Sequence, residues 1–342
     1  MSYGKLETNH MPNLPRSLTL VAVVLLANCG GSDGDAPAGN ADAGTDSAGG
    51  PPSLEARKNA AAQSVADNAL CKRLPAFYWE IGDVSGPLAS GAVGAKFTAQ
   101  TPMAIASASK FVFGAYVVER FKGDLSKLDA SAMRMLSGYT SLDYNSCLGS
   151  KSVSACLGAA SNSTHTAANV DHFFYNGGHF QKYAVDLGLG NDDNAALAAH
   201  IKEQVGPDLS FTYGSPQLAA GITTSPTDYA VFLRKILAGT LAIKDHLGEQ
   251  PVCTLPSSCP TAKYSPAAAA WHYSYGHWVE DDPATGDGAF SSPGAYGFYP
   301  WIDASKTYYG IVARFALTAQ AYLESAECGV VVRKAFLTGT AQ

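Results

Sequence analysis

The feature that most constrains the fold is the segment from Phe111 to Val118, because its side chains would be apolar nearly all round a helix. A helix that is apolar on every face has to be buried among other elements. Burial of that kind needs a sizeable domain, and 342 residues of which 46% are hydrophobic can supply one. We therefore predict a globular domain built around this helix.

The first 29 residues are typical of an export signal rather than of a folded domain. An apolar run, SLTLVAVVLLANC, follows Arg16, and it is short for a membrane span but suits a signal peptide. The run ends in LANCG, which resembles a bacterial lipobox, so Cys29 would carry a lipid. Ordinary signal-peptide cleavage is the alternative, because Asn28 stands where a small residue is usual. We expect residues 1–29 to be a signal peptide.

A tether separates this signal from the folded domain. Residues 30–53 consist mainly of Gly, Ala, Asp and Ser, with almost no apolar surface to offset the entropy of ordering them. We expect them to be disordered and residues 54–342 to form the domain. The predicted location is the bacterial cell envelope, facing the periplasm or the exterior, with contact to the membrane through the lipid only.

The remaining cysteines suggest disulfide bonds. With Cys29 lipidated, six of the seven are left, and an even number in an exported chain favours pairing, although six cysteines allow 15 pairings. Metal binding is the weaker alternative, because no C-x-x-C or H-x-x-x-H spacing occurs. Short loops favour two pairs, Cys147 with Cys156 and Cys253 with Cys259. Cys71 and Cys328 then remain for the third pair.

The charge of the chain indicates which class of molecule it binds. The formal net charge is −6, only 15% of the residues are charged, and no basic run occurs. A chain of this kind lacks the electrostatic footprint of a nucleic-acid-binding protein. A neutral or small polar substrate fits better, and the oligomeric state stays open.

Local signals predict elements at both ends of the chain. Residues 54–70 have the composition of a helix, and residues 77–83 and 87–94 flank a turn as in a β-hairpin. A further helix follows Ser225, which is its N-cap, and ends before Gly239.

The final third is predicted to add strands and a last helix. Apolar and aromatic runs over residues 275–281, 295–303 and 308–317 are separated by turn residues, and residues 323–339 are typical of a closing helix. Residues 129–220 are mixed and rich in loops. This order indicates an α+β domain in which both ends of the chain share one antiparallel sheet.

The phrase before the buried helix, AIASASKF, carries a candidate nucleophile and a candidate base. Ser107 and Lys110 are three residues apart, so on a helix they share a face and the amine reaches back toward the hydroxyl. A lysine surrounded by apolar residues has a lowered pKa and becomes a base near neutral pH. The helix N-terminus adds N–H groups that suit a developing oxyanion.

The spacing alone has a second interpretation. The same S-x-x-K pattern occurs at Ser2 and Lys5, in a segment that processing would remove. On spacing alone, Ser107 is equally well a plain N-cap, and Lys110 a side chain that carries its amine to the surface.

The wider phrase PMAIASASKF resembles the active-site serine motif of the penicillin-recognising serine hydrolases, which include class C β-lactamases, DD-carboxypeptidases and related esterases. The resemblance covers roughly residues 55–338 in element order. It implies a β-lactamase/transpeptidase-like α+β fold, in which an antiparallel sheet is flanked by helices beside a helical region. It also implies that Ser107 is the nucleophile and that Lys110 accepts its proton.

The family's second motif, Tyr-x-Asn, is matched by FFYNGGHF. The resemblance implies that Tyr175 lies beside the serine, shares its proton with the lysine, and passes it to the leaving group. Gly177 stands where the family has the asparagine that holds the substrate's acyl-side carbonyl, and Asn176, one position early, is the candidate for that role. The alternative is an aromatic turn with an Asn-Gly-Gly bend.

The third motif, Lys/His/Trp-x-Gly on the strand facing the serine, is matched by FSSPGAYGFYPWID. Ser292 replaces the usual cation or aromatic residue, and Gly294 lets substrate lie close to the backbone. The Ala295 N–H would complete the oxyanion hole with that of Ser107. Pro293 is awkward in a central strand, so a shift of the motif along the chain is the alternative.

The sequence gives less support to other catalytic mechanisms. No G-x-S-x-G elbow occurs in the predicted domain, residues 54–342, and the S-D-N and K-T-G strings of class A β-lactamases are absent. Asp143, Asp171, Glu280 and Asp281 could pair for acid–base work, but acidic loop residues are more often simply solvated.

The resemblance therefore predicts an exported serine hydrolase that acts through an acyl-enzyme on Ser107, without metal or organic cofactor. Gly177 and Ser292 replace groups that would grip a penicillin, which favours an esterase or amidase acting on a small ester or amide. The alternative is a surface binding module that kept the fold and lost turnover.

Overall fold

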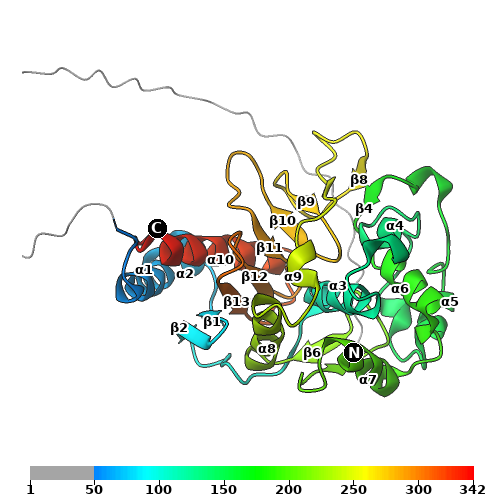
Figure 1. The fold of residues 1–342 in the computed structure, drawn as a ribbon, viewed down its shortest axis with the longest axis horizontal. Coiled ribbons are helices and arrows are strands. Elements are labelled where there is room, and N and C mark those ends of the chain that lie inside the picture. The colour runs from blue at the N-terminus through cyan, green and yellow to red at the C-terminus, as the bar shows by residue number, and fades with distance from the viewer. Residues whose placement is uncertain (1–49) are drawn as a thin grey trace, which may run out of the picture. The chain divides into compact units, whose positions relative to one another are not determined.

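The domain is organised around a large antiparallel sheet. The computed structural model describes residues 50–342, and the predicted signal peptide, Cys29 and the tether up to residue 49 lie outside them. The strands follow the order β2-β1-β13-β12-β11-β10-β9-β7, with every neighbouring pair antiparallel (Figure 1). They are β1 (Phe77–Asp83), β2 (Gly86–Val93), β7 (Val252–Cys253), β9 (His272–Tyr273), β10 (Trp278–Glu280), β11 (Ala289–Ser291), β12 (Tyr299–Ile302) and β13 (Tyr309–Ala313).

Helices and short strands complete the domain. The α-helices are α1 (Leu54–Asp67), α2 (Ala69–Lys72), α3 (Ser109–Arg120), α4 (Ala130–Met133), α5 (Val153–Gly158), α6 (Gly178–Ala184), α7 (Asn194–Val205), α8 (Pro226–Leu237), α9 (Ile243–His246) and α10 (Ala321–Thr338). Single turns of 3₁₀ or π geometry are η1 (Ala106–Ala108), η2 (Leu125–Lys127), η3 (Asn145–Cys147), η4 (Ala167–Asn169) and η5 (Val185–Leu189). Two small sheets join β3 (Met103–Ala104), β6 (Ile222–Thr224) and β5 (Thr212–Tyr213), and β4 (Phe173–Phe174) with β8 (Ala262–Tyr264).

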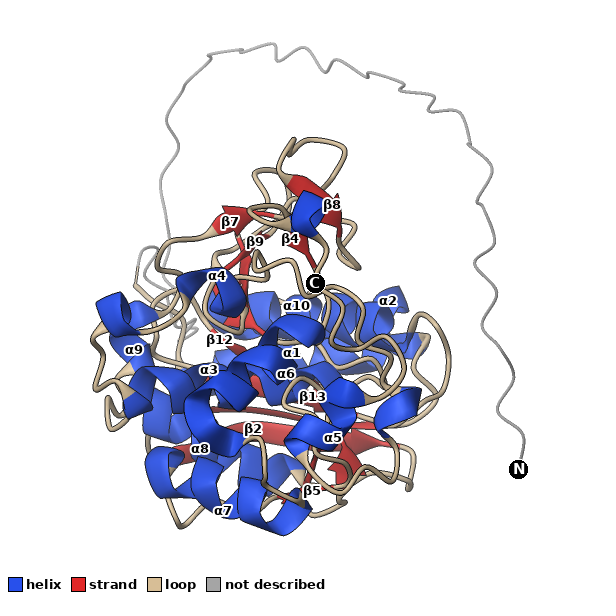
Figure 2. Ribbon diagram, turned by 90° about the vertical axis from the view of Figure 1, so that its right-hand side faces the viewer, coloured by secondary structure: helices blue, strands red, loops and turns tan. Residues whose placement is uncertain are grey.

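The sheet separates two cores because side chains alternate along each strand. In β1, Phe77, Trp79 and Ile81 pack in the core that includes α1, α2 and α10, whereas Tyr78 packs in the larger core on the other face. That larger core contains α3, α8 and the helical region. Helices thus enclose the central strands (Figure 2). The α+β class with an antiparallel sheet made from both ends of the chain is confirmed.

The predicted buried helix is confirmed as α3. Every residue from Ser109 to Val118 is buried. A side chain at Gly114 would collide with the carbonyl oxygen of Tyr275, so glycine is what allows the chain near Tyr275 to lie against the helix backbone. The predicted N-cap at Ser225 is confirmed: its Oγ accepts a hydrogen bond from the Asp228 N–H at the start of α8.

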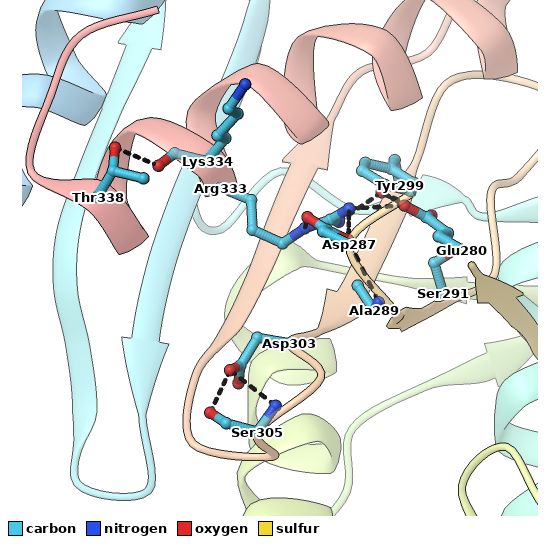
Figure 3. Close-up of polar contacts among 10 residues, drawn as sticks. All are labelled: Glu280, Asp287, Ala289, Ser291, Tyr299, Asp303, Ser305, Arg333, Lys334 and Thr338. Carbon is cyan, nitrogen blue, oxygen red and sulfur yellow. Dashed lines mark hydrogen bonds and ion pairs between the residues drawn. The ribbon is translucent and has the colours of Figure 1, made fainter. Parts of the chain in front are cut away.

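A buried polar network attaches α10 to the sheet (Figure 3). The Arg333 guanidinium lies 2.7 Å from carboxylate oxygens of both Glu280 and Asp287, and it donates to the Tyr299 hydroxyl at 2.8 Å. Tyr299 and Ser291 each donate to Glu280. The network therefore connects one helix with β10, β11 and β12, and it uses Glu280 for structure rather than for acid–base work.

Three disulfides close the domain. They join the two pairs that short loops favoured, Cys147 with Cys156 and Cys253 with Cys259, and the pair left over, Cys71 with Cys328. The last of these connects α2 to α10 across 257 residues of sequence. Among residues 50–342, no helix has the length and apolar character needed to cross a membrane.

Candidate active site

Ser107 lies on the tight turn that leads into α3. The preceding strand β3 pairs with β6, and the Ile105 N–H donates to the Ile222 carbonyl at 3.0 Å, which fixes the approach to the turn. Ala106 has a φ of 45°, a conformation that costs a residue with a Cβ atom energy and that is found preferentially at functional sites. The N-cap of α3 is Ala108, and no side chain caps it. The interpretation of Ser107 as a plain N-cap is therefore wrong.

Lys110 is fully buried beside Ser107. Its Nζ lies 2.9 Å from the Ser107 Oγ and donates to the Ala219 carbonyl at 3.0 Å. The interpretation of Lys110 as a surface-reaching side chain is wrong as well. No carboxylate in the described part of the chain pairs with it. Burial without a counter-ion lowers its pKa to about 7, so the amine is available as a proton acceptor at neutral pH.

Tyr175 lies close to Lys110. The Lys110 Nζ is 4.7 Å from the centre of the Tyr175 ring, and that ring stacks on Trp278 at 5.1 Å. Burial raises the pKa of Tyr175 to about 12, and the nearby side chains of Ser107 and Trp278 oppose that rise. The phenol is therefore neutral over the physiological range and can relay a proton by giving up its own as it takes another. The structure brings Ser107, Lys110 and Tyr175 together.

The segment after β11 contacts the serine turn directly. The Ser292 hydroxyl donates to the Ser107 carbonyl at 2.8 Å. A Cβ atom on Gly294 would collide with the Ile105 carbonyl oxygen, so a glycine is needed where this segment crosses the serine turn. The N–H groups of Ser292 and Gly294 continue the pairing with the chain of β12, and Pro293 falls between them, past the end of the strand. The missing N–H of Pro293 therefore breaks no ladder bond.

Two free backbone N–H groups lie at this junction. In the part of the chain that the structure describes, neither the Ser107 N–H nor the Ala295 N–H donates to a protein acceptor. The Ser107 N–H precedes α3, whose N-terminus adds partial positive charge. Ala295 is exposed in the turn between β11 and β12, directly after Gly294. Donors of this kind suit an oxyanion.

In the second motif, Asn176 does not have the role that the sequence suggested. The Asn176 Oδ1 accepts from the N–H groups of Leu142 at 3.0 Å and Gly178 at 2.8 Å, and its Nδ2 donates to the Leu142 carbonyl at 3.4 Å. The amide therefore ties two backbone segments together, and the structure does not bring it to Ser107. Gly177 is buried next to Ala219, whose carbonyl accepts from Lys110.

Sequence reasoning missed two contributors to the site. Ala219 supplies the carbonyl that holds the lysine, and Tyr144 lies against Gly177. Neither belongs to a local motif, because both reach the site through the folding of the loop-rich middle of the chain. The one available signal was the glycine at position 177, which implied that another residue fills the space of the missing side chain.

A groove of about 380 Å³ opens at the end of the sheet where the turn between β11 and β12 lies. Its walls include Lys96, Phe97 and residues 314–317, where β13 ends. The ring of Phe315 lies 4.8 Å from that of Tyr296, and the Ala316 N–H donates to the Tyr296 carbonyl. The groove therefore adjoins the turn that carries the free Ala295 N–H.

Comparisons with known proteins identify the fold. No family model and no curated protein sequence matches the chain. Solved structures match over most of it, among them a "putative beta-lactamase" from Bacteroides dorei, at 20% identity, with 81% of this chain and 97% of that chain covered and a TM-score of 0.58.

Two other matches are hydrolases by name. EstCE1, a hydrolase with promiscuous acyltransferase activity, is 12% identical over 83% of this chain and 98% of its own, with a TM-score of 0.57. A D-stereospecific amidohydrolase from Streptomyces sp. is 13% identical over 81% of this chain and 99% of its own, with a TM-score of 0.53. At these identities the likeness shows the fold, and the expected β-lactamase-like fold is confirmed.

Proposed function

We propose that this protein is a serine hydrolase that cleaves small esters or amides through an acyl-enzyme on Ser107. The observation that carries the proposal is the buried, uncompensated Lys110, whose Nζ lies 2.9 Å from the Ser107 Oγ. A fully buried lysine without a carboxylate partner costs stability, and such groups are found preferentially where chemistry needs them.

The reaction begins with proton transfer from the Ser107 hydroxyl to the neutral Lys110 amine. The Oγ bonds to the substrate's carbonyl carbon, and the carbonyl oxygen becomes an oxyanion that accepts from the Ser107 and Ala295 N–H groups. The proton moves by way of the Tyr175 hydroxyl to the departing alkoxide or amine as its bond to the carbonyl carbon breaks. Water then attacks the acyl-enzyme and gives a proton to the same pair, which passes it to the Ser107 Oγ as the acyl bond breaks, so that the acid and free serine are released.

The substrate class follows from the polar groups around the serine. Ser292 replaces a cation, and its hydroxyl is engaged with the Ser107 carbonyl. The Asn176 amide is engaged with Leu142. The site therefore lacks the cation and the free amide that the resemblance would imply for binding an anionic β-lactam. We favour substrates with neutral acyl groups. The hydrolase and amidohydrolase among the structural matches support this reaction type.

Export is part of the proposal. Disulfides persist in oxidising compartments, and the domain has three. Together with the signal-like sequence of residues 1–29, they support a protein of the cell envelope. Lipidation of Cys29 rests on the lipobox-like sequence alone.

The test is turnover of p-nitrophenyl acetate and butyrate, and of the corresponding anilides, by the purified domain. We expect Ser107→Ala to lower kcat/KM by at least about 10³-fold, because the nucleophile is lost. Ser305→Ala, in the exposed turn between β12 and β13, is the matched control and should leave the rate unchanged. Equal rates for wild type and Ser107→Ala, or none with any substrate, would favour the binding module without turnover.

A further inference from the structure

We propose that the Tyr144 hydroxyl is the polar contact for the acyl side of the substrate, which makes Tyr144 a specificity-determining residue. This inference rests on the proposed hydrolase function and deepens it, because it names the acyl groups that the site prefers. Its starting point is the space around Gly177.

The side-chain space at position 177 is already occupied. An ideal Cβ atom on Gly177 would lie 2.7 Å from the Tyr144 Oη, 2.8 Å from the Leu142 Cδ2 and 2.9 Å from the Ala219 Cβ. Real Cβ atoms do not approach polar or carbon atoms so closely, so no side chain fits without displacing these groups. The phenol oxygen therefore stands where an asparagine at position 177 would begin.

The position of the hydroxyl ties it to the catalytic groups. Ala219, which borders the same space, supplies the carbonyl that accepts from the Lys110 Nζ. Gly177, against which the Tyr144 hydroxyl packs, follows Tyr175 by two residues. The Tyr144 hydroxyl thus lies beside Gly177 and next to Ala219, the residue whose carbonyl holds the lysine.

The hydroxyl has a proton to offer. The Tyr144 Oη packs against Gly177, and in residues 50–342 it donates to no protein acceptor. Burial and the neighbouring Tyr175 raise the pKa of Tyr144, so the phenol stays neutral. Asn176 offers no competing donor, because its Nδ2 is used by the Leu142 carbonyl. A neutral O–H with a fixed oxygen and a free hydrogen is a donor for a substrate carbonyl.

The loop that carries Tyr144 is held rigidly. The Gln217 Nε2 donates to the Tyr144 carbonyl at 3.0 Å, and the disulfide between Cys147 and Cys156 closes the loop three residues later. The Asn162 Oδ1 also accepts from the Asp143 N–H at 2.7 Å. A donor that is held in place by its own backbone loses little entropy when it binds, which is what a recognition group requires.

The preferred acyl group follows from the donor. A phenol gives one hydrogen bond to a neutral acceptor and brings no charge, so it should favour an acyl group that has an amide or ketone oxygen near the reacting carbonyl. A plain alkyl chain leaves the hydroxyl unpaired. An N-acylamino acid ester or amide is the kind of substrate that this contact would select.

A matched pair of boronic acids tests the contact without requiring turnover. Acetamidomethylboronic acid and butylboronic acid have similar chain lengths, and both form a reversible tetrahedral adduct when the Ser107 Oγ bonds to boron. Only the first has an acceptor oxygen, its amide carbonyl, on the side chain. Dissociation constants are measured by titration calorimetry for wild type, Tyr144→Phe and the control Tyr308→Phe, whose ring lies against Phe336 on the far side of the sheet.

We expect Tyr144→Phe to weaken the acetamidomethyl compound by roughly 5- to 10-fold, as for loss of one hydrogen bond, and butylboronic acid by less than twofold. Tyr308→Phe should change neither. Equal losses for both compounds, or no loss for either, would overturn the role of Tyr144. If Ser107→Ala binds both compounds as tightly as wild type does, the proposed hydrolase function fails instead, because no serine adduct forms. A melting temperature for each variant shows that it is folded.

Discussion

At the scale of single residues, the site is governed by one unfavourable burial. Lys110 is surrounded by protein and has only neutral partners, the Ser107 hydroxyl and the Ala219 carbonyl. Water would solvate its charged form better than this environment does, so the neutral form is favoured and the pKa falls to about 7. The same burial that costs stability makes the amine a base.

The pH dependence of the rate should report this shift. A base acts only when it is unprotonated, so kcat/KM for an ester should rise tenfold per pH unit below about pH 7 and level off above it. Tyr175 should add no further change until near pH 12. Stopped-flow measurement of acylation between pH 5 and 10 gives the profile. A limb centred near pH 10 would mean that the lysine is solvated as usual.

The residues of the site differ in how far they could be predicted. The helical spacing of Ser107 and Lys110 is a local property, and the apolar sequence after them made burial of the lysine predictable. Tyr144 and Ala219 could not be predicted, because their positions depend on how residues 129–220 fold against α3. Asn176 has the amide that the role requires, but this amide forms its hydrogen bonds with the backbone of Leu142 instead.

At the scale of elements, side chains of β10 and α10 support β11 and the segment after it, which contacts the serine turn. Glu280 on β10 accepts from Ser291 at the end of β11, and Ser292 reaches the Ser107 carbonyl. Arg333 on α10 neutralises Glu280 at 2.7 Å, with both side chains only 1% exposed (Figure 3). A helix on one face of the sheet thus supports a segment that contacts the site.

Removal of the arginine should be costly. Arg333→Met leaves the buried Glu280 carboxylate without its partner, and we expect a loss of about 3–5 kcal/mol in the free energy of unfolding. Lys334→Met, on the next and exposed position of α10, should stay within about 0.5 kcal/mol of wild type. Urea unfolding at pH 7 measures both. A loss below about 1 kcal/mol for Arg333→Met would show that the network does not anchor the helix.

Elements with complete local signals were predictable, and short ones were not. The helix α8 has its serine cap, its first-turn proline and its terminal glycine, and the hairpin β1–β2 has apolar strands around a turn. Strands of two or three residues, such as β4 and β7, are too short to carry a periodic pattern. They form because the neighbouring chain offers backbone partners, which only the tertiary fold determines.

At the scale of the whole molecule, both ends of the chain build one sheet. The N-terminal strand β1 pairs with the late strand β13, and the disulfide from Cys71 to Cys328 fixes the same closure through helices. This arrangement was predictable from the order of elements. The activity is not, because one fold can support many reactions and the structural matches include proteins with different names.

The most direct test of the central claim is where a serine-directed probe attaches. A fluorophosphonate loses fluoride when an activated serine oxygen bonds to its phosphorus, and peptide mass spectrometry locates the added group. We predict one adduct per molecule, on the peptide that contains Ser107, and none in Ser107→Ala or Lys110→Met at neutral pH. An adduct on another residue, or equal labelling of wild type and Ser107→Ala, would contradict a nucleophile activated by the buried lysine.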